Sequence, residues 1–158
     1  MALALPNESS SSQQPKRVVV VDDNEILLRA WRKILDKQEC QTFITSDPFE
    51  ALSYLTSNGV DILIADVVMP YMDGFELIQK AQASFPQLRI ILTTGYVCDF
   101  QKIKLHVETP DIHVLLKPYN DIQQIRKFLT RVLEDDDTLD TEDSFKNPDD
   151  IRIHLWAL

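Results

Sequence analysis

Short apolar runs alternate with amphipathic segments along most of this chain. The runs are rich in β-branched residues and lack a helical period, which is typical of strands buried on both faces of a parallel sheet. They predict strands at residues 17–21, 40–45, 62–66, 88–94 and 112–116. The third run, between Gly59 and Pro70, ends on a single carboxylate, Asp66. We expect this strand to lie in the middle of the sheet.

Between the runs, apolar residues recur at spacings of three and four, which is the period of one helical face. This pattern predicts helices at residues 24–37, 48–58, 75–84, 100–107 and 122–133. Because each strand is followed by a helix over a short loop, the connections are parallel crossovers and both faces of the sheet are covered. The predicted fold is α/β, a flavodoxin-like doubly wound (βα)5 with a five-stranded parallel sheet of order 2-1-3-4-5.

Polar residues stand where four of the predicted strands end. Asp22 and Asp23 follow the first strand, and Asp66 ends the third. Thr94 ends the fourth strand and Lys117 follows the fifth. The carboxyl ends of parallel strands share one edge of the sheet, where ligands bind. The strand order therefore predicts that these five side chains meet in one crevice.

Three carboxylates in one crevice repel one another unless a cation compensates. Oxygen ligands of this kind favour Mg2+, which takes one or two carboxylates together with phosphate oxygens. Lys117 adds a point charge for a phosphoryl group and Thr94 adds a hydroxyl donor. The set predicts phosphoryl transfer with Asp66 as the nucleophile, because a carboxylate can form an aspartyl phosphate. The predicted metal ligands are Asp22, Asp23, Asp66 and the backbone carbonyl of Val68.

These residues and their neighbours resemble the receiver domain of two-component response regulators, from Arg17 to Glu134. The matching segments are Val-Asp22-Asp23-Asn, Ala-Asp66-Val-Val-Met-Pro70 with Asp73-Gly74, Leu-Thr-Thr94-Gly-Tyr, and Leu-Leu-Lys117-Pro118. The resemblance implies that the acidic pair holds Mg2+ and that a histidine kinase or phosphotransfer protein phosphorylates Asp66. It also implies that Thr94 and Lys117 contact the phosphoryl group and that the Lys117–Pro118 bond is cis.

The expected function is that of a single-domain response regulator, a phosphorylation-dependent switch with output through protein contacts. A phosphorelay intermediate and a phosphate-independent pseudo-receiver are the alternatives, although a pseudo-receiver would usually lack one of the site residues. We expect the chain to assist its own phosphorylation and dephosphorylation without acting as an enzyme on another substrate. A monomer or a phosphorylation-dependent dimer is expected.

Two other classes share parts of this pattern. A phosphatase of the haloacid dehalogenase type would want a second aspartate two residues after its nucleophile, where this chain has Val68. A flavodoxin would want a phosphate loop rich in Ser, Thr and Gly after the first strand, where Asp22-Asp23-Asn24 stands. Both classes are therefore disfavoured.

One position departs from the family pattern. Many receivers carry an aromatic switch residue three positions before the lysine, and here that residue is Val114. His113 is adjacent, but its side chain should point to the opposite face of the sheet. The resemblance also places Tyr96 and Val68 over the phosphoryl site, where apolar bulk would hinder water. We therefore hypothesise a long-lived phosphoryl state.

Most of the net charge of −9 lies near the C-terminus. Residues 134–150 carry a net charge of −8, and the rest of the chain carries −1. The rest of the chain lacks the clustered Lys and Arg that nucleic-acid binding requires, so no direct binding to nucleic acid is expected. No apolar run approaches the ~20 residues of a membrane span, and no signal-peptide pattern is present. We therefore expect a cytoplasmic protein without membrane insertion. Cys40 and Cys98 lack metal or redox spacing and are expected to be inert.

Composition predicts three parts: a flexible N-terminal tail (1–16), the receiver domain (17–134) and an acidic C-terminal tail (135–158) that ends in an apolar segment. The apolar segment, Ile151–Leu158, is costly to expose, so it should dock on the body or on a partner, or lead into a further region. Its alternating apolar residues permit either an added strand or a helix.

Overall fold

The computed structural model describes residues 14–95, 100–108, 111–135 and 152–156. The strands are β1 (Lys16–Val21), β2 (Cys40–Thr45), β3 (Ile62–Asp66), β4 (Arg89–Thr94), β5 (Asp111–Leu116) and β6 (Arg152–Trp156). The helices are α1 (Glu25–Leu35), α2 (Pro48–Asn58), α3 (Gly74–Ser84), α4 (Phe100–His106) and α5 (Ile122–Leu133). The strands and helices predicted from the sequence are all present, with ends that differ by at most two residues.

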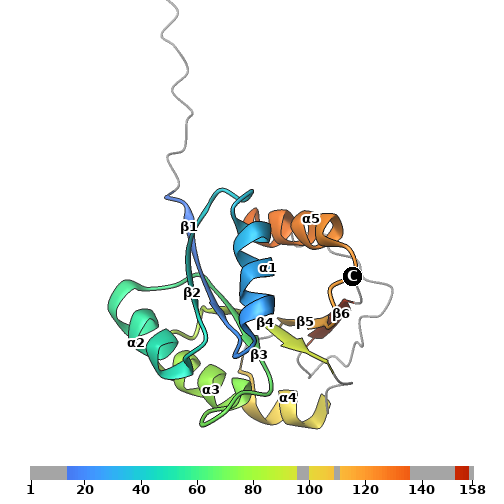
Figure 1. The fold of residues 1–158 in the computed structure, drawn as a ribbon. Coiled ribbons are helices and arrows are strands. Elements are labelled where there is room, and N and C mark those ends of the chain that lie inside the picture. Colours follow the sequence, from blue (N-terminus) through green and yellow to red (C-terminus); the bar gives the residue numbers. More distant parts are fainter. Residues whose placement is uncertain (1–13, 96–99, 109–110, 136–151, 157–158) are drawn as a thin grey trace, which may run out of the picture.

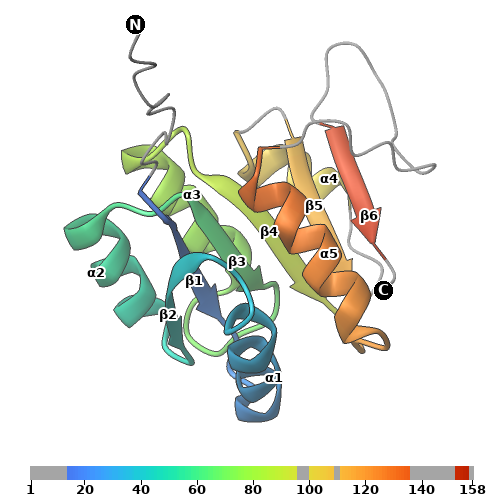
Figure 2. The same cartoon turned by 90° about the horizontal axis from the view of Figure 1, so that it is seen from above.

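The sheet is parallel throughout, in the order β2-β1-β3-β4-β5-β6 (Figure 2). The predicted order 2-1-3-4-5 is therefore confirmed. The predicted number of strands was wrong, because β6 adds a sixth beside β5.

Helices cover both faces of the sheet, with α1 and α5 on one side and α2, α3 and α4 on the other (Figure 1). Alternate residues of each strand point to opposite faces. In β1, Val18 and Val20 pack in the cluster with α1 and α5, whereas Val19 and Val21 pack in the cluster with α2 and α3. Both sets are buried, which explains why the strands read as continuous apolar runs.

Helix starts are fixed by side-chain caps. In four of the helices, the side chain of the residue before the first turn accepts a hydrogen bond from a backbone N–H of that turn. These N–H groups have no acceptor within the helix itself. The caps of α1, α2, α3 and α5 are Asn24, Asp47, Asp73 and Asp121. The predicted start of this helix at residue 48 is thus confirmed for α2. Among the described helices, none has the length and apolar character that crossing a bilayer requires.

The apolar C-terminal segment docks on the body as a strand. Ile153 is buried in the cluster that contains Ile112 and Val114. Trp156 packs on Phe128 of α5, with 4.7 Å between ring centroids. Strand β6 therefore contributes to the cores on both faces of the sheet.

His113 on β5 fixes the position of Trp156. Its Nδ1 accepts a hydrogen bond of 3.2 Å from Trp156 Nε1, which requires a neutral imidazole. Burial, assisted by the charges of His154 and Arg89, lowers the pKa of His113 to about 3, so the ring is neutral at ordinary pH. His113 faces Phe128 of α5 while Val114 lies in the opposite cluster, which confirms the predicted orientation.

Replacing Trp156 by Ala should destabilise the protein, because it removes the contact with Phe128 and the donor to His113. We expect the free energy of unfolding, measured by urea denaturation, to fall by about 2 kcal/mol. Leu105→Ala, at an exposed position of α4, is the control and should change it by less than about 0.5 kcal/mol. Equally small losses in both variants would contradict the docking of β6.

Candidate functional site

Three carboxylates meet at the carboxyl edge of the sheet. Asp22 and Asp23 follow β1, and Asp66 ends the neighbouring strand β3. One oxygen from each lies within 4.8 Å of the others. Asp22 and Asp66 are 1% and 6% exposed, whereas Asp23 is open to solvent. The convergence that the strand order predicted is therefore present.

Lys117 bridges the two buried carboxylates. Its Nζ lies 2.7 Å from Asp22 Oδ2 and 3.2 Å from Asp66 Oδ1. The other oxygen of Asp22 accepts a hydrogen bond of 2.9 Å from Asn24 N. The backbone N–H of Lys117 donates to the Thr94 carbonyl at 2.8 Å, which fastens the end of β5 to β4. The Lys117–Pro118 peptide is cis, as the resemblance implied.

The environment of Asp66 makes its ionised form costly. Burial raises the pKa of Asp66, and the nearby charge of Asp22 acts in the same direction. Lys117 and a hydrogen bond from the Val68 backbone N–H partly offset this by lowering the pKa. A cation at the site would relieve the remaining repulsion.

The donor set suits a hard divalent cation. All three side chains offer oxygen, and their spacing lets one ion contact each of them. Asp22, Asp23 and Asp66 are the residues that would hold Mg2+. The Val68 carbonyl stays a prediction. Thr94 is the last residue of β4, at the same edge of the sheet, and it is buried.

Gly74 packs closely against the backbone at the end of β3, where Asp66 lies. A Cβ on Gly74 would lie 2.3 Å from the Asp66 carbonyl oxygen, closer than any carbon can approach. Gly74 N also donates to the Val67 carbonyl at 2.9 Å. The absence of a side chain therefore lets α3 start directly against the end of β3, beside its cap Asp73.

The loop after Asp66 presents apolar side chains to solvent. Tyr71 is 95% exposed, and Val68 is also exposed. The backbone of Tyr71 has φ 69°, a left-handed conformation that costs a non-glycine residue about 1 kcal/mol. Tyr96, which we expected over the phosphoryl site, lies outside the described residues, as does Cys98.

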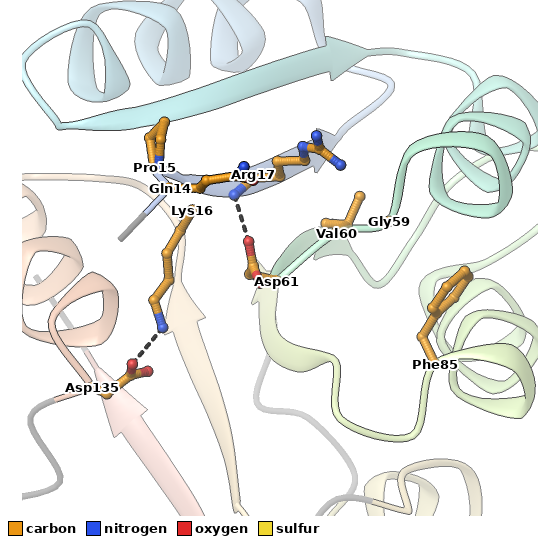
Figure 3. Close-up of a pocket in the computed structure, with 9 residues that line it drawn as sticks. All are labelled: Gln14, Pro15, Lys16, Arg17, Gly59, Val60, Asp61, Phe85 and Asp135. Carbon is orange, nitrogen blue, oxygen red and sulfur yellow. Dashed lines mark hydrogen bonds and ion pairs between the residues drawn. The ribbon is translucent and has the colours of Figure 1, made fainter. Parts of the chain in front are cut away.

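A hollow of about 540 Å³ lies at the opposite end of the sheet (Figure 3). Its charged groups are already partnered: Asp61 accepts from Arg17 N at 2.7 Å, and Asp135 pairs with Lys16 and Arg89. The Asp61 contact joins the starts of β1 and β3, and the Asp135 contacts join the starts of β1 and β4 to the segment that follows α5. We therefore interpret this hollow as structural and the carboxylate cluster as the candidate site.

Comparison with known proteins agrees with this geometry. The family model of the response regulator receiver domain matches residues 18–130, and the chain belongs to this family of two-component signalling proteins. Sporulation initiation phosphotransferase F of Bacillus subtilis (strain 168) is 25% identical over 118 residues, which cover 75% of this chain and 94% of that protein. A putative two-component response regulator of Arabidopsis thaliana is 30% identical over 155 residues, which cover 93% of this chain and 27% of that protein.

A solved receiver domain has a similar fold. The signal receiver domain of an HD domain-containing protein from Pseudomonas fluorescens Pf-5 has a TM-score of 0.68 at 27% identity, over 77% of this chain and 97% of that one. Several other curated relatives are longer, and the chain spans about a third of their length.

Sequence reasoning missed one residue near the site. Tyr119, two positions after Lys117, accepts a hydrogen bond of 3.3 Å from Trp31 Nε1. The available signal was an aromatic residue following Lys117-Pro118. Nothing in the sequence indicated that Trp31 is its hydrogen-bond partner.

Gly74→Ala should damage the support of Asp66, because the added methyl group must displace the backbone of β3. We expect the free energy of unfolding to fall by about 3 kcal/mol in chemical denaturation. Gly95→Ala is the matched control, since a Cβ there meets nothing within 4 Å. Equal stability of the two variants would disprove the close approach.

Asp66→Asn should stabilise the protein when no metal ion is present. The raised pKa of Asp66 means that its carboxylate opposes folding at neutral pH, and this cost shrinks as the pH falls through the folded pKa. In EDTA at pH 7 the melting temperature of the variant should exceed that of wild type, and the gap should narrow towards pH 3.8, the ordinary aspartate value. Thermal scans by circular dichroism test this.

The exposed Asp23 provides the control, since Asp23→Asn should have a smaller effect in EDTA. Saturating Mg2+ should favour wild type over Asp66→Asn, because ligand binding stabilises the state that binds it. A gap that stays constant with pH would count against a buried, repelled carboxylate.

Proposed function

We propose that this chain is a phosphorylation-dependent signalling switch whose Asp66 accepts a phosphoryl group from a phosphohistidine of a histidine kinase or phosphotransfer protein. The observation that carries the proposal is the Lys117 ammonium held between Asp22 and Asp66 within a three-carboxylate cluster. Membership of the receiver family supports it.

In the proposed transfer, an Asp66 oxygen attacks phosphorus and the phosphorus–nitrogen bond of the phosphohistidine breaks. The ring nitrogen keeps the electron pair of that bond. The Lys117 ammonium, 3.2 Å from Asp66, is positioned to neutralise charge on the transferred group, and Thr94 supplies a hydroxyl donor. Asp66 must be ionised to attack, so we expect transfer to fall at acid pH as its carboxyl group becomes protonated.

When bound, Mg2+ would supply charge neutralisation for the phosphoryl oxygens and relieve the repulsion among the carboxylates. Asp22 and Asp23 are the proposed ligands besides Asp66. Asp22 already contacts Lys117 and Asn24, so its orientation is fixed by the protein. The exposed Asp23 offers its carboxylate to solvent at the mouth of the cluster.

We propose that the phosphoryl group remains on the protein until another protein or water removes it, so the chain turns over no separate substrate and is not an enzyme in that sense. Output would pass through protein contacts in the cytoplasm, without nucleic acid, from a monomer or a phosphorylation-dependent dimer. A phosphorelay role is the second candidate. It is favoured by the match to nearly the full length of sporulation initiation phosphotransferase F.

Incubation with acetyl phosphate and Mg2+, followed by intact mass spectrometry, tests the proposal. We expect one added phosphoryl group on wild type, complete loss of the adduct in Asp66→Asn, and no adduct in EDTA. Asp61→Asn is the control and should be labelled, because Asp61 binds the start of β1 at the opposite end of the sheet. An unlabelled wild type, or an adduct that survives Asp66→Asn, would refute the assignment.

A further inference from the structure

Exposed apolar side chains gather at the edge of the sheet where the carboxylate cluster lies. In the described part of the chain six large apolar residues are exposed, and five of them lie between a strand and the next helix or in the first turn of that helix. In a parallel sheet all of these segments lie at the carboxyl edge. The five are Ile26, Phe49, Val68, Tyr71 and Ile122, whereas the sixth, Leu105, lies in the last turn of α4.

Tyr71 is the most exposed of these residues, at 95%, and its backbone is held in place. The Met72 N–H donates to the Pro70 carbonyl at 2.8 Å, and Tyr71 between them has φ 69°. This is a γ-turn of the rare form with a positive φ, which strains any residue except glycine. Met69 and Met72, which flank the turn, are buried in the core. The loop that follows Asp66 therefore fixes an aromatic ring in solvent.

This arrangement is typical of a protein-docking surface. Single exposed apolar residues are common on any protein, but here they are concentrated at one edge. Tyrosine is enriched among the residues that dominate binding at protein interfaces, because its ring offers a large contact area and a polar tip. A ring on a fixed backbone also loses little conformational freedom when a partner covers it.

The charge of the same edge indicates the charge of its partner. The described basic residues in these segments are Lys102 and Lys117, and Lys117 is paired within the site. A protein surface with Lys and Arg around an apolar contact would be complementary, whereas nucleic acid or an anionic membrane would be repelled. The exposed acidic residues in these segments are Asp23, Glu25, Asp47, Glu50, Asp73, Glu76 and Asp121.

We propose that the protein that phosphorylates Asp66 docks on this edge through an apolar surface surrounded by Lys and Arg, and that Tyr71 is its main contact on this chain. The inference rests on the proposed function of Asp66. A phosphohistidine can reach Asp66 only from this edge, because Asp66 is the last residue of a strand that is buried throughout. The exposed residues of the carboxyl edge are therefore the ones that a donor protein meets.

The test compares a small phosphodonor with protein donors. Acetyl phosphate needs no docking surface. The protein donors are the purified histidine kinases and phosphotransfer proteins of the organism that encodes the chain, each carrying radiolabelled phosphohistidine. Tyr71→Gly is the variant, because glycine adopts a positive φ without strain and the ring is lost without disturbing the turn. Its melting temperature should be no lower than that of wild type. Leu105→Ala, exposed on α4 away from this edge, is the control.

The expected effect of Tyr71→Gly is confined to docking. With the protein donor that labels wild type fastest, the donor concentration for half-maximal transfer should rise at least about tenfold, since a central interface contact is lost. Transfer at saturating donor and labelling by acetyl phosphate should stay within about twofold of wild type. Leu105→Ala should match wild type with both kinds of donor.

Salt provides a second measurement on the wild type. Higher salt should slow transfer from the protein donor, because it screens the attraction between basic and acidic side chains. It should not slow labelling by acetyl phosphate, which is an anion and is repelled by the acidic edge.

Equal slowing of Tyr71→Gly with both kinds of donor, or no slowing with the protein donor, would overturn the inference. Transfer from the protein donor that quickens with salt would also overturn it, as would a wild type that acetyl phosphate labels and none of the protein donors labels. A wild type that acetyl phosphate leaves unlabelled would overturn the proposed function as well. A labelled wild type that Tyr71→Gly matches with the protein donor would overturn this inference alone.

Discussion

The site depends on one ammonium that compensates two buried carboxylates. Asp22 and Asp66 come from adjacent strands, and their desolvation is tolerated because Lys117 reaches both. Lys117 can do so because its backbone is fastened to Thr94 at the end of β4. A shift in the register of β1, β3, β4 or β5 would therefore separate these charges.

Much of the fold was predictable because the physical causes are local. Strands buried on both faces must be apolar throughout, and Asn24, Asp47, Asp73 and Asp121 satisfy the first turns of helices whatever the tertiary structure. Strand β6 could not be predicted, because its alternating residues suit either a strand or a helix. Its position depends on His113, an acceptor that lies 43 residues from Trp156 in the chain.

The candidate site was predictable to the extent that the topology determines it. Parallel strands bring their carboxyl ends to one edge, so Asp22, Asp23 and Asp66 had to meet there. The hydrogen bond of Trp31 could not be predicted, because its acceptor Tyr119 lies 88 residues away in the chain. The need for glycine at position 74 could not be predicted, because it arises from the close approach of this residue to the Asp66 carbonyl in the folded protein.

Two adjacent residues of β5, Val114 and His113, connect the strand that leads to Lys117 with the two faces of the sheet. Val114 is buried towards the cluster with α3, and it pairs with Leu155 of β6. His113 points to the other face and holds Trp156. Because β6 occupies the outer side of β5, that edge is closed to strand addition by a partner. A displacement of β5 would instead reach the surface through β6 and through α5, which Trp156 contacts at Phe128.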